Sequence, residues 1–235
     1  MIKNHKDSIQ IPMVGFGTYL INNEETEKYI LSAFLAGYRH IDTAEAYGNE
    51  EGVGLAIKNA RSELGLSREE IFVTTKLWPG NESWGQPPKT YESTLESLKA
   101  SLDKLKLEYI DLYLIHAPFS KDNRLEQWRA LCELRKMGKA KSIGVCNYNK
   151  SHIEQIKAAG LPLPDANQIE LHPCSQKNSL VYYLSENDIL PIAYSSLVPL
   201  AEWRAADGED SAKTDKMVAD GANDNSPFKV MAKKY

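Results

Sequence analysis

The sequence predicts an α/β fold, a (β/α)8 TIM barrel, and three features of it lead to that expectation. Short apolar segments alternate with longer segments of helical period along most of the chain. The short segments are rich in aliphatic and β-branched residues without strict alternation, as in parallel strands that are buried on both faces. Polar residues stand at the carboxyl ends of several of these segments, where the strands of a barrel converge on one mouth. These strand-end residues are Asp42, Lys76, His116, Asn147, Glu170 and Tyr194.

Seven segments are predicted to be strands. They are residues 14–17, 39–42, 71–76, 110–116, 141–145, 166–169 and 189–193. A doubly wound sheet is the main alternative, and in that fold a Gly-x-Gly-x-x-Gly motif commonly joins an early strand to a helix. No such motif is present, because Gly15-Phe-Gly17 leads into Thr-Tyr-Leu and then a polar turn. The pattern therefore favours the barrel.

Helices are predicted between these strands. The clearest has an apolar stripe with a 4-3-4-3 spacing that starts at Tyr91 and ends at Leu105. Others carry Tyr29 and Phe34 before Gly37, and Leu125 to Leu134 before Gly138, glycine being a common residue just after a helix. A fourth carries Ile153 and Ile156 and ends at Gly160.

The C-terminal part departs from a complete barrel. Residues 200–227 are polar and rich in Asp, Ala and Gly, which predicts a mobile loop. Residues 228–235 have the pattern of the first turns of a seventh barrel helix, and no segment is left for an eighth strand. We expect one domain, residues 1–235, with seven strands and a gap between residues 14–17 and 189–193. The eighth strand and the last helices are missing from this pattern, so we expect the chain to fold poorly.

Composition excludes several classes of protein. The chain has 28 Lys and Arg residues and 32 Asp and Glu residues, which gives a net charge of −4. Because the two signs are interspersed and no basic face stands out, nucleic acid is not an expected partner. Cys132, Cys146 and Cys174 are odd in number and fit a reducing compartment better than a disulfide framework. The first residues have no apolar signal region, and no apolar run is long enough to span a membrane. We expect a cytoplasmic monomer.

Four residues form the strongest candidate site: Asp42, Tyr47, Lys76 and His116. Each one alone has an ordinary explanation, such as a surface ion pair or a hydrogen-bonded structural histidine. Together, at or near successive strand ends, they suit carbonyl reduction, which needs a proton donor at the carbonyl oxygen. Lys76 can stabilise the phenolate of Tyr47, and Asp42 can supply the counter-charge of a buried Lys76. Neutral His116 can donate a hydrogen bond to the carbonyl oxygen.

Seven motifs in order resemble one family, the aldo-keto reductases. The first two are Gly37-Tyr-Arg-His-Ile-Asp-Thr-Ala44 and Tyr47-Gly-Asn-Glu50, which resemble the signature around the catalytic Asp and Tyr. Thr74-Thr-Lys-Leu-Trp78 and Tyr109-Ile-Asp-Leu-Tyr-Leu-Ile-His116 resemble the strands of the catalytic Lys and His. The others are Ile143-Gly-Val-Cys-Asn-Tyr148, Asn167-Gln-Ile-Glu-Leu-His-Pro173 and Ala193-Tyr-Ser-Ser196, and the similarity runs from about Ile11 to Ser196.

The resemblance implies a role for each site residue. Tyr47 is the proton donor, Lys76 lowers the pKa of Tyr47, Asp42 holds Lys76, and His116 orients the substrate. It implies NADPH as cofactor, with NADH possible, and small carbonyl compounds as substrates. The implied cofactor contacts are Gly17, Thr18, Asp42, Cys146, Asn147, Gln168, Tyr194, Ser195, Ser196 and Leu197, and the implied substrate contacts are Tyr19, Trp78 and His116.

Two departures from the family pattern stand out. The family usually has serine where this chain has Cys146, so a weak thiol donor replaces a hydroxyl next to the nicotinamide carboxamide. A small buried cysteine that only packs explains the position equally well. In the family, the residues that bind the adenosine 2′-phosphate lie in a segment beyond the last residue of this sequence, so we expect weak cofactor binding.

Two other functions remain open on these residues. A barrel metallohydrolase would use His116, His172, Asp42 and Glu170, but it predicts clustered ligands such as His-x-His, and the sequence has none, so we expect no metal site. A cofactor-binding regulatory subunit, or a truncated isoform of impaired activity, is the second alternative. The complete set of four candidate residues argues against the regulatory role.

Overall fold

The computed structural model describes residues 2–5, 9–172, 175–196, 223–225 and 227–234. Its centre is a curled sheet of seven parallel strands in chain order, β3-β4-β5-β6-β7-β8-β9. The strands are β3 (Phe16–Gly17), β4 (His40–Asp42), β5 (Phe72–Leu77), β6 (Ile110–Ile115), β7 (Ala140–Cys146), β8 (Ala166–Glu170) and β9 (Leu190–Tyr194). All seven predicted strands are therefore confirmed, as is the barrel architecture. Within the described residues, β3 and β9 are the two edges of this sheet, as predicted.

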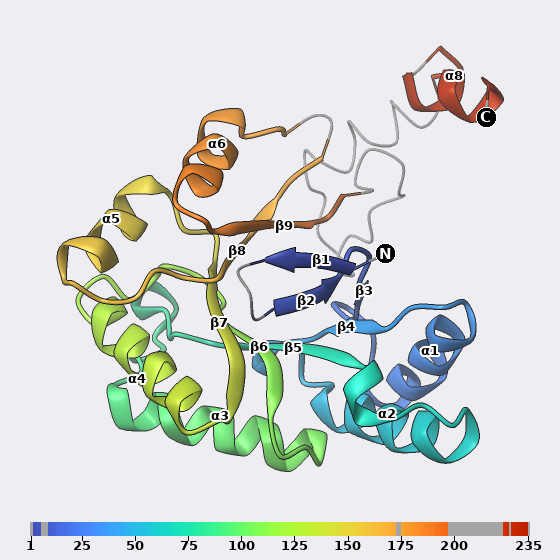
Figure 1. Ribbon diagram of the computed structural model, residues 1–235, viewed down its shortest axis with the longest axis horizontal. Coiled ribbons are helices and arrows are strands. Elements are labelled where there is room, and N and C mark those ends of the chain that lie inside the picture. The colour runs from blue at the N-terminus through green and yellow to red at the C-terminus, as the bar shows by residue number, and fades with distance from the viewer. Residues whose placement is uncertain (1, 6–8, 173–174, 197–222, 226, 235) are drawn as a thin grey trace.

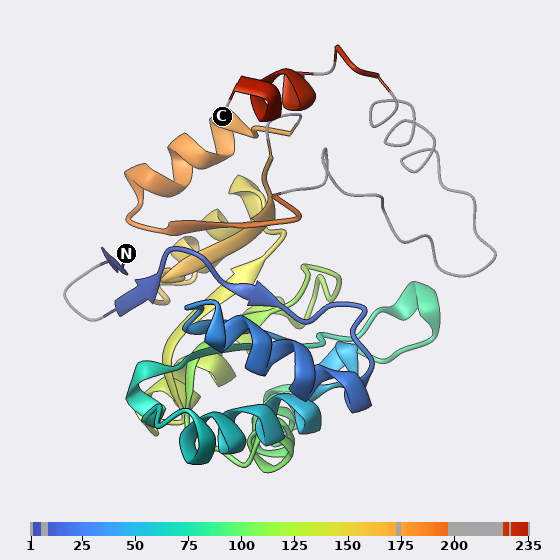
Figure 2. The ribbon, with the colours of Figure 1, turned by 90° about the vertical axis from the view of Figure 1, so that its right-hand side faces the viewer.

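Helices follow the strands and lie around the outside of the curl (Figures 1 and 2). They are α1 (Asn23–Leu35), α2 (Glu50–Glu63), α3 (Tyr91–Leu105), α4 (Arg124–Lys136), α5 (Lys150–Ala158) and α6 (Asn178–Glu186). A further helix, α8 (Pro227–Lys234), lies apart from the sheet in Figure 1. Three short 3₁₀ helices lie in the connections: Glu45–Tyr47, Arg68–Glu70 and Glu82–Trp84. The helix predicted at residues 228–235 corresponds to α8. Most of the loop predicted at residues 200–227 lies outside the described residues.

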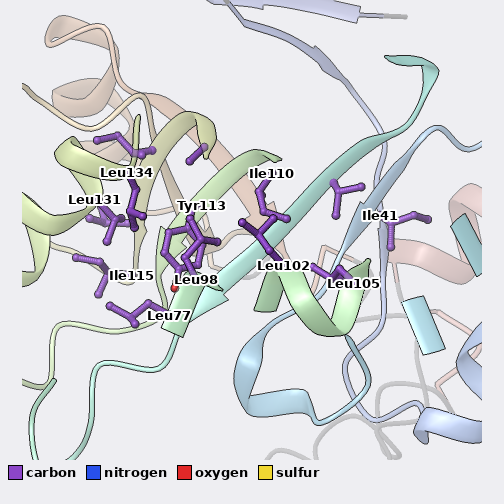
Figure 3. Close-up of a cluster of buried hydrophobic side chains, with 14 of the residues drawn as sticks. Ile41, Leu77, Leu98, Leu102, Leu105, Ile110, Tyr113, Ile115, Leu131 and Leu134 are labelled. Atoms are coloured by element: carbon purple, nitrogen blue, oxygen red, sulfur yellow. The ribbon is translucent and has the colours of Figure 1, made fainter. Parts of the chain in front are cut away.

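The larger hydrophobic core lies between the sheet and its helices (Figure 3). Leu98, Leu102 and Leu105 of α3 carry the predicted apolar stripe and pack with Tyr113 and Ile115 of β6. All of these side chains are buried. Burial of such side chains is worth about 1.5–3 kcal/mol each, so this core is what holds the helices to the strands.

A second, smaller core fills the inside of the curl. Leu112 and Leu114 alternate along β6 with Tyr113 and Ile115, so they point to the opposite face of the sheet. They pack with Cys146, with Ala166 and Leu190 of the neighbouring strands, and with Ile11. Ile11 belongs to a hairpin that the sequence did not predict, formed by β1 (Ile2–His5) and antiparallel β2 (Ile9–Pro12). Figure 1 shows this hairpin within the curl of the sheet.

Helices α2 and α6 were also not predicted from the sequence, and α2 shows why. Its interior holds Gly52 and Gly54, and glycine lowers helix propensity by about 1 kcal/mol. The structure explains both glycines by close packing. A Cβ at Gly52 would clash with the backbone of Asn23, and a Cβ at Gly54 would clash with the backbone of Leu105. The two glycines let α2 approach its neighbours α1 and α3 closely.

Candidate active site

The predicted site residues lie at the carboxyl ends of the strands. Asp42 is the last residue of β4, and Lys76 is the next-to-last residue of β5. His116 and Asn147 directly follow β6 and β7, and Tyr194 is the last residue of β9. Parallel strands bring these ends to one side of the sheet. The structure therefore gathers residues that are more than a hundred positions apart in the sequence.

Lys76 is the centre of the site. Its side chain is fully buried, and its Nζ donates to Asp42 Oδ1 at 2.5 Å, to the backbone oxygen of Thr43 at 2.8 Å and to the Tyr47 hydroxyl at 3.3 Å. Tyr47 reaches this position from the 3₁₀ helix that follows β4. The other carboxylate oxygen of Asp42 accepts a hydrogen bond from Gln168 Nε2 at 2.7 Å. All three donors of the ammonium and both oxygens of the carboxylate are thus used inside the site.

Burial and charge act in opposite directions at Lys76 and at Tyr47. Burial alone would lower the pKa of Lys76, but Asp42 and the Tyr47 phenolate favour the ammonium and leave its pKa raised. The pKa of Tyr47 is also raised, because burial outweighs the lowering effect of Lys76. Lys76 therefore acts on the pKa of Tyr47 in the predicted direction, and burial sets the net direction. Lys76 is an ammonium and Tyr47 a protonated phenol at neutral pH.

His116 is a neutral imidazole at neutral pH. Burial, together with the nearby Lys76 ammonium, lowers its pKa to about 4. Its ring stands edge-on to Tyr47, with 5.5 Å between ring centroids, and edge-on to Trp78 at 5.7 Å. Its Nδ1 is buried, and no hydrogen-bond partner for it lies among the described residues. A neutral ring beside the Tyr47 hydroxyl can donate a hydrogen bond to an oxygen bound there.

Asn49, which was not predicted to be a site residue, connects the loops that follow β3 and β4. It is fully buried, and its Nδ2 donates to the backbone oxygens of Thr18 at 2.8 Å and Ile21 at 2.9 Å. Its Oδ1 accepts from the hydroxyl of Thr43 at 2.8 Å and from that of Thr18 at 3.3 Å. Both ends of its amide are hydrogen-bonded, as is usual for a buried asparagine. Its place in the motif Tyr47-Gly-Asn-Glu50 is the sequence signal that could have pointed to it.

The predicted cofactor residues line one side of the mouth. The backbone N–H of Thr18 donates to the backbone oxygen of Asp42 at 2.9 Å, and a Cβ at the neighbouring Gly17 would meet only open space. The Tyr194 hydroxyl donates to Asn147 Oδ1 at 3.0 Å, and the backbone N–H of Asn147 donates to the backbone oxygen of Gln168 at 2.9 Å.

Cys146 and the serines that follow β9 complete this side. The thiol of Cys146 is buried and lies 4.0 Å from Gln168 Oε1, and burial raises its pKa. It packs in the inner core, as expected of a small buried cysteine, and its contact with the cofactor stays a prediction. Ser195 has a left-handed backbone with φ of 52°, and Ser196 follows it. The predicted contact at Leu197 lies outside the described residues.

An aromatic wall continues from Tyr47 and His116 to the outside. It comprises Tyr19, Trp78, Trp84 and Phe119. Tyr19 and Trp78 were predicted as substrate contacts, and Trp84 and Phe119 were not. Trp84 stacks on Trp78 with 5.8 Å between ring centroids, and Phe119 stands edge-on to Trp78 at 5.7 Å. Trp84 is 65% exposed and Phe119 46% exposed. Tyr19 lies against Tyr47 at 5.1 Å.

The four residues that a barrel metallohydrolase would use as ligands do not form a metal-binding cluster. His172 Nε2 lies 3.2 Å from Glu170 Oε1. Across the part of the chain that the structure describes, His, Cys, Asp and Glu side chains form no group of three or more that could hold a metal ion. The same part contains no helix that is long and apolar enough to cross a membrane.

The family model and the similar proteins described below agree on one family for this chain. A sequence model described as the Aldo/keto reductase family matches residues 13–233. Methylglyoxal reductase DkgA of Escherichia coli (strain K12) is 43% identical over 193 residues, which are 82% of this chain and 66% of DkgA. Glyoxal reductase of Bacillus subtilis (strain 168) is 40% identical over 209 residues, which are 88% of this chain and 70% of that protein. The chain thus spans about two thirds of the length of these relatives.

A solved structure shows the same similarity in three dimensions. The crystal structure of a Bombyx mori aldo-keto reductase in complex with NADP superposes with a TM-score of 0.81 at 32% identity. The superposition covers 100% of this chain and 76% of the insect protein.

Proposed function

Since the chain belongs to the aldo/keto reductase family, we propose that it reduces an aldehyde or ketone to an alcohol, with Tyr47 as the proton donor. The observation that carries the proposal is the buried Lys76 ammonium, which is hydrogen-bonded to Asp42 and to the Tyr47 hydroxyl at the mouth of the barrel. A general acid with a cation beside it, next to a neutral histidine, can protonate and stabilise the oxygen of a carbonyl group that is being reduced.

A bound nicotinamide cofactor supplies the hydride in this reaction. The residues present fit its nicotinamide end, because the side-chain amide of Asn147 and the partly exposed ring of Tyr194 are hydrogen-bonded to each other, and the Gln168 amide lies on the neighbouring strand, bonded to Asp42. Amides can pair with a carboxamide, and an aromatic ring can stack on a flat heterocycle. Gly17 leaves open space beside Thr18 for a close approach. We favour NADPH because the insect relative was solved with NADP, and NADH is the alternative.

Tyr47 gives its proton to the carbonyl oxygen when negative charge develops there. The raised pKa keeps the phenol protonated in the resting site, so the acid is loaded at neutral pH. The Lys76 ammonium, 3.3 Å from the hydroxyl, stabilises the phenolate that forms. Asp42 keeps Lys76 in place and in its charged form. Neutral His116 donates a hydrogen bond to the same oxygen and thus shares its developing charge.

We propose 2-oxoaldehydes as substrates. The support is the printed function of two relatives, a methylglyoxal reductase and a glyoxal reductase, at 43% and 40% identity. The site offers such a compound one oxygen position between Tyr47 and His116 and an apolar surface at Trp78.

Initial-rate assays test this function. We expect oxidation of NADPH in proportion to added methylglyoxal or glyoxal, with slower oxidation of NADH. Cofactor binding is measured in parallel by fluorescence titration. Binding of either cofactor without turnover of any aldehyde would contradict the reductase and support the regulatory alternative.

A further inference from the structure

The loop between β5 and α3, residues 78–90, is folded tightly against the mouth of the site. Its base is closed by a hydrogen bond from the Lys89 N–H to the Pro79 oxygen at 3.0 Å. Gln127 Nε2 donates to both of these residues' carbonyl oxygens, at 3.0 Å each. Gly80 has a φ of 85° and packs so closely on the Pro87 backbone that a side chain would clash there. The tip of the loop carries Trp84 on its 3₁₀ helix.

Glu45 joins this loop to the acid. It lies two residues before Tyr47, at the start of the same 3₁₀ helix. One carboxylate oxygen accepts from the backbone N–H of Trp78 at 3.0 Å, and the other accepts from Lys89 Nζ at 2.6 Å. Lys89 Nζ also donates to Ser97 Oγ on α3 at 2.5 Å. Both charged side chains are about three-quarters buried, so water competes only partly for these contacts.

We propose that Glu45, with Lys89, is a positioning residue that fixes the outer aromatic wall (Trp78, Trp84 and Phe119) relative to the acid Tyr47. It thereby favours carbonyl substrates that carry an aryl or other large apolar group. This inference rests on the proposed reduction. Glu45 touches no reacting atom; it acts by holding the first and next-to-last residues of the loop at one distance from the helix of Tyr47.

The wall explains why substrate size is the property affected. Ring centroids lie 5.5 Å apart from Tyr47 to His116, 5.7 Å from His116 to Trp78, and 5.8 Å from Trp78 to Trp84. An aldehyde group bound between Tyr47 and His116 leaves the methyl group of methylglyoxal short of Trp84. The phenyl ring of phenylglyoxal extends toward Trp84 and Phe119, which expose enough ring surface to cover it.

Methylglyoxal and phenylglyoxal therefore form a matched pair of substrates, with the same reacting group and a different apolar part. In Glu45→Ala we expect kcat/KM for phenylglyoxal to fall about tenfold, mostly through KM, because small misplacements of binding groups are costly. For methylglyoxal we expect a change of less than about threefold. Glu45→Gln can still accept from the Trp78 N–H, so its loss should be smaller. Glu82→Ala removes an exposed carboxylate of the same loop and is the control.

Two further measurements separate positioning from general support of the fold. Trp84→Ala should cause the same selective loss, and the double variant Glu45→Ala/Trp84→Ala should lose little more, since the two act on one contact surface. Backbone hydrogen exchange of residues 78–90 should rise in Glu45→Ala and stay unchanged in Glu82→Ala. Equal losses for both substrates, or unchanged hydrogen exchange in Glu45→Ala, would overturn the inference. Wild-type protein that reduces neither aldehyde would refute the proposed function, and hydrogen exchange would still decide the positioning of the loop.

Discussion

Replacing Lys76 by methionine tests the electrostatics of the site most sharply. The substitution keeps an unbranched side chain of similar length and removes the charge. It leaves the Thr43 oxygen without the ammonium donor, and among the described residues Gln168 is then the remaining side-chain partner of Asp42. Removing one partner of a buried ion pair costs about 3–5 kcal/mol, because the other charge stays buried without compensation. We therefore expect Lys76→Met to lower the free energy of unfolding by that amount at neutral pH.

The pH dependence of this loss has a definite sign. The pKa of Lys76 is raised in the folded protein, so its contribution is fully present below its unfolded pKa of about 10.5 and is lost only above it. Wild-type stability should thus show no step from this lysine between about pH 6 and pH 9.

Urea unfolding at several pH values measures both effects, with Lys141→Met as the control. Lys141 pairs with Asp111 at 3.4 Å but is 52% exposed, so its loss should cost less than about 1 kcal/mol. The activity of Lys76→Met should fall with that of the acid, and adding Tyr47→Phe should cost little more because the two residues work as a unit. A Lys76→Met protein as stable as the control variant, at every pH, would refute this reasoning.

Three further perturbations give distinct results. The pKa of His116 is about 4 in the fold against 6.5 unfolded, so the wild type should lose about 3 kcal/mol as pH falls through this window. His116→Asn should show a flatter pH profile in calorimetry, and an equal profile would count against the neutral buried ring. Cys146→Ser places a stronger donor beside Gln168 and should tighten cofactor binding by about two- to tenfold in a fluorescence titration; weaker binding would show that Cys146 mainly packs. Gly54→Val should lower the stability by at least about 1–3 kcal/mol through its clash with the Leu105 backbone, and an unchanged melting temperature would contradict the packing of α2 on α3.

The sequence predicted the sheet well because its signals are local. All seven strands were apparent as apolar segments, and the stripe from Tyr91 to Leu105 matches α3 residue for residue. The elements that were missed have weak local signals. Helix α2 contains Gly52 and Gly54, which have a reason only once α1 and α3 are in place. The β1–β2 hairpin is short, and Ile11 gains its meaning from the interior of the curl that it fills.

The site shows the same division. Motif order identified Asp42, Tyr47 and Lys76, and the structure places their side chains in one hydrogen-bonded group. The net direction of the Tyr47 pKa could not be predicted, because it depends on how burial compares with the charge of Lys76. Glu45 was also missed, since its partners Trp78 and Lys89 lie 33 and 44 residues away and only the fold brings them together.

The central claim is that Tyr47 donates the proton, and the most direct measurement is the single-turnover reduction of methylglyoxal by wild-type protein and by Tyr47→Phe. The account predicts that the rate falls by at least roughly two orders of magnitude in Tyr47→Phe, as for loss of a general acid. The affinity for NADPH, measured on the same samples, should change little because the ring is kept. A Tyr47→Phe protein that reduces methylglyoxal at a near wild-type rate would contradict the account.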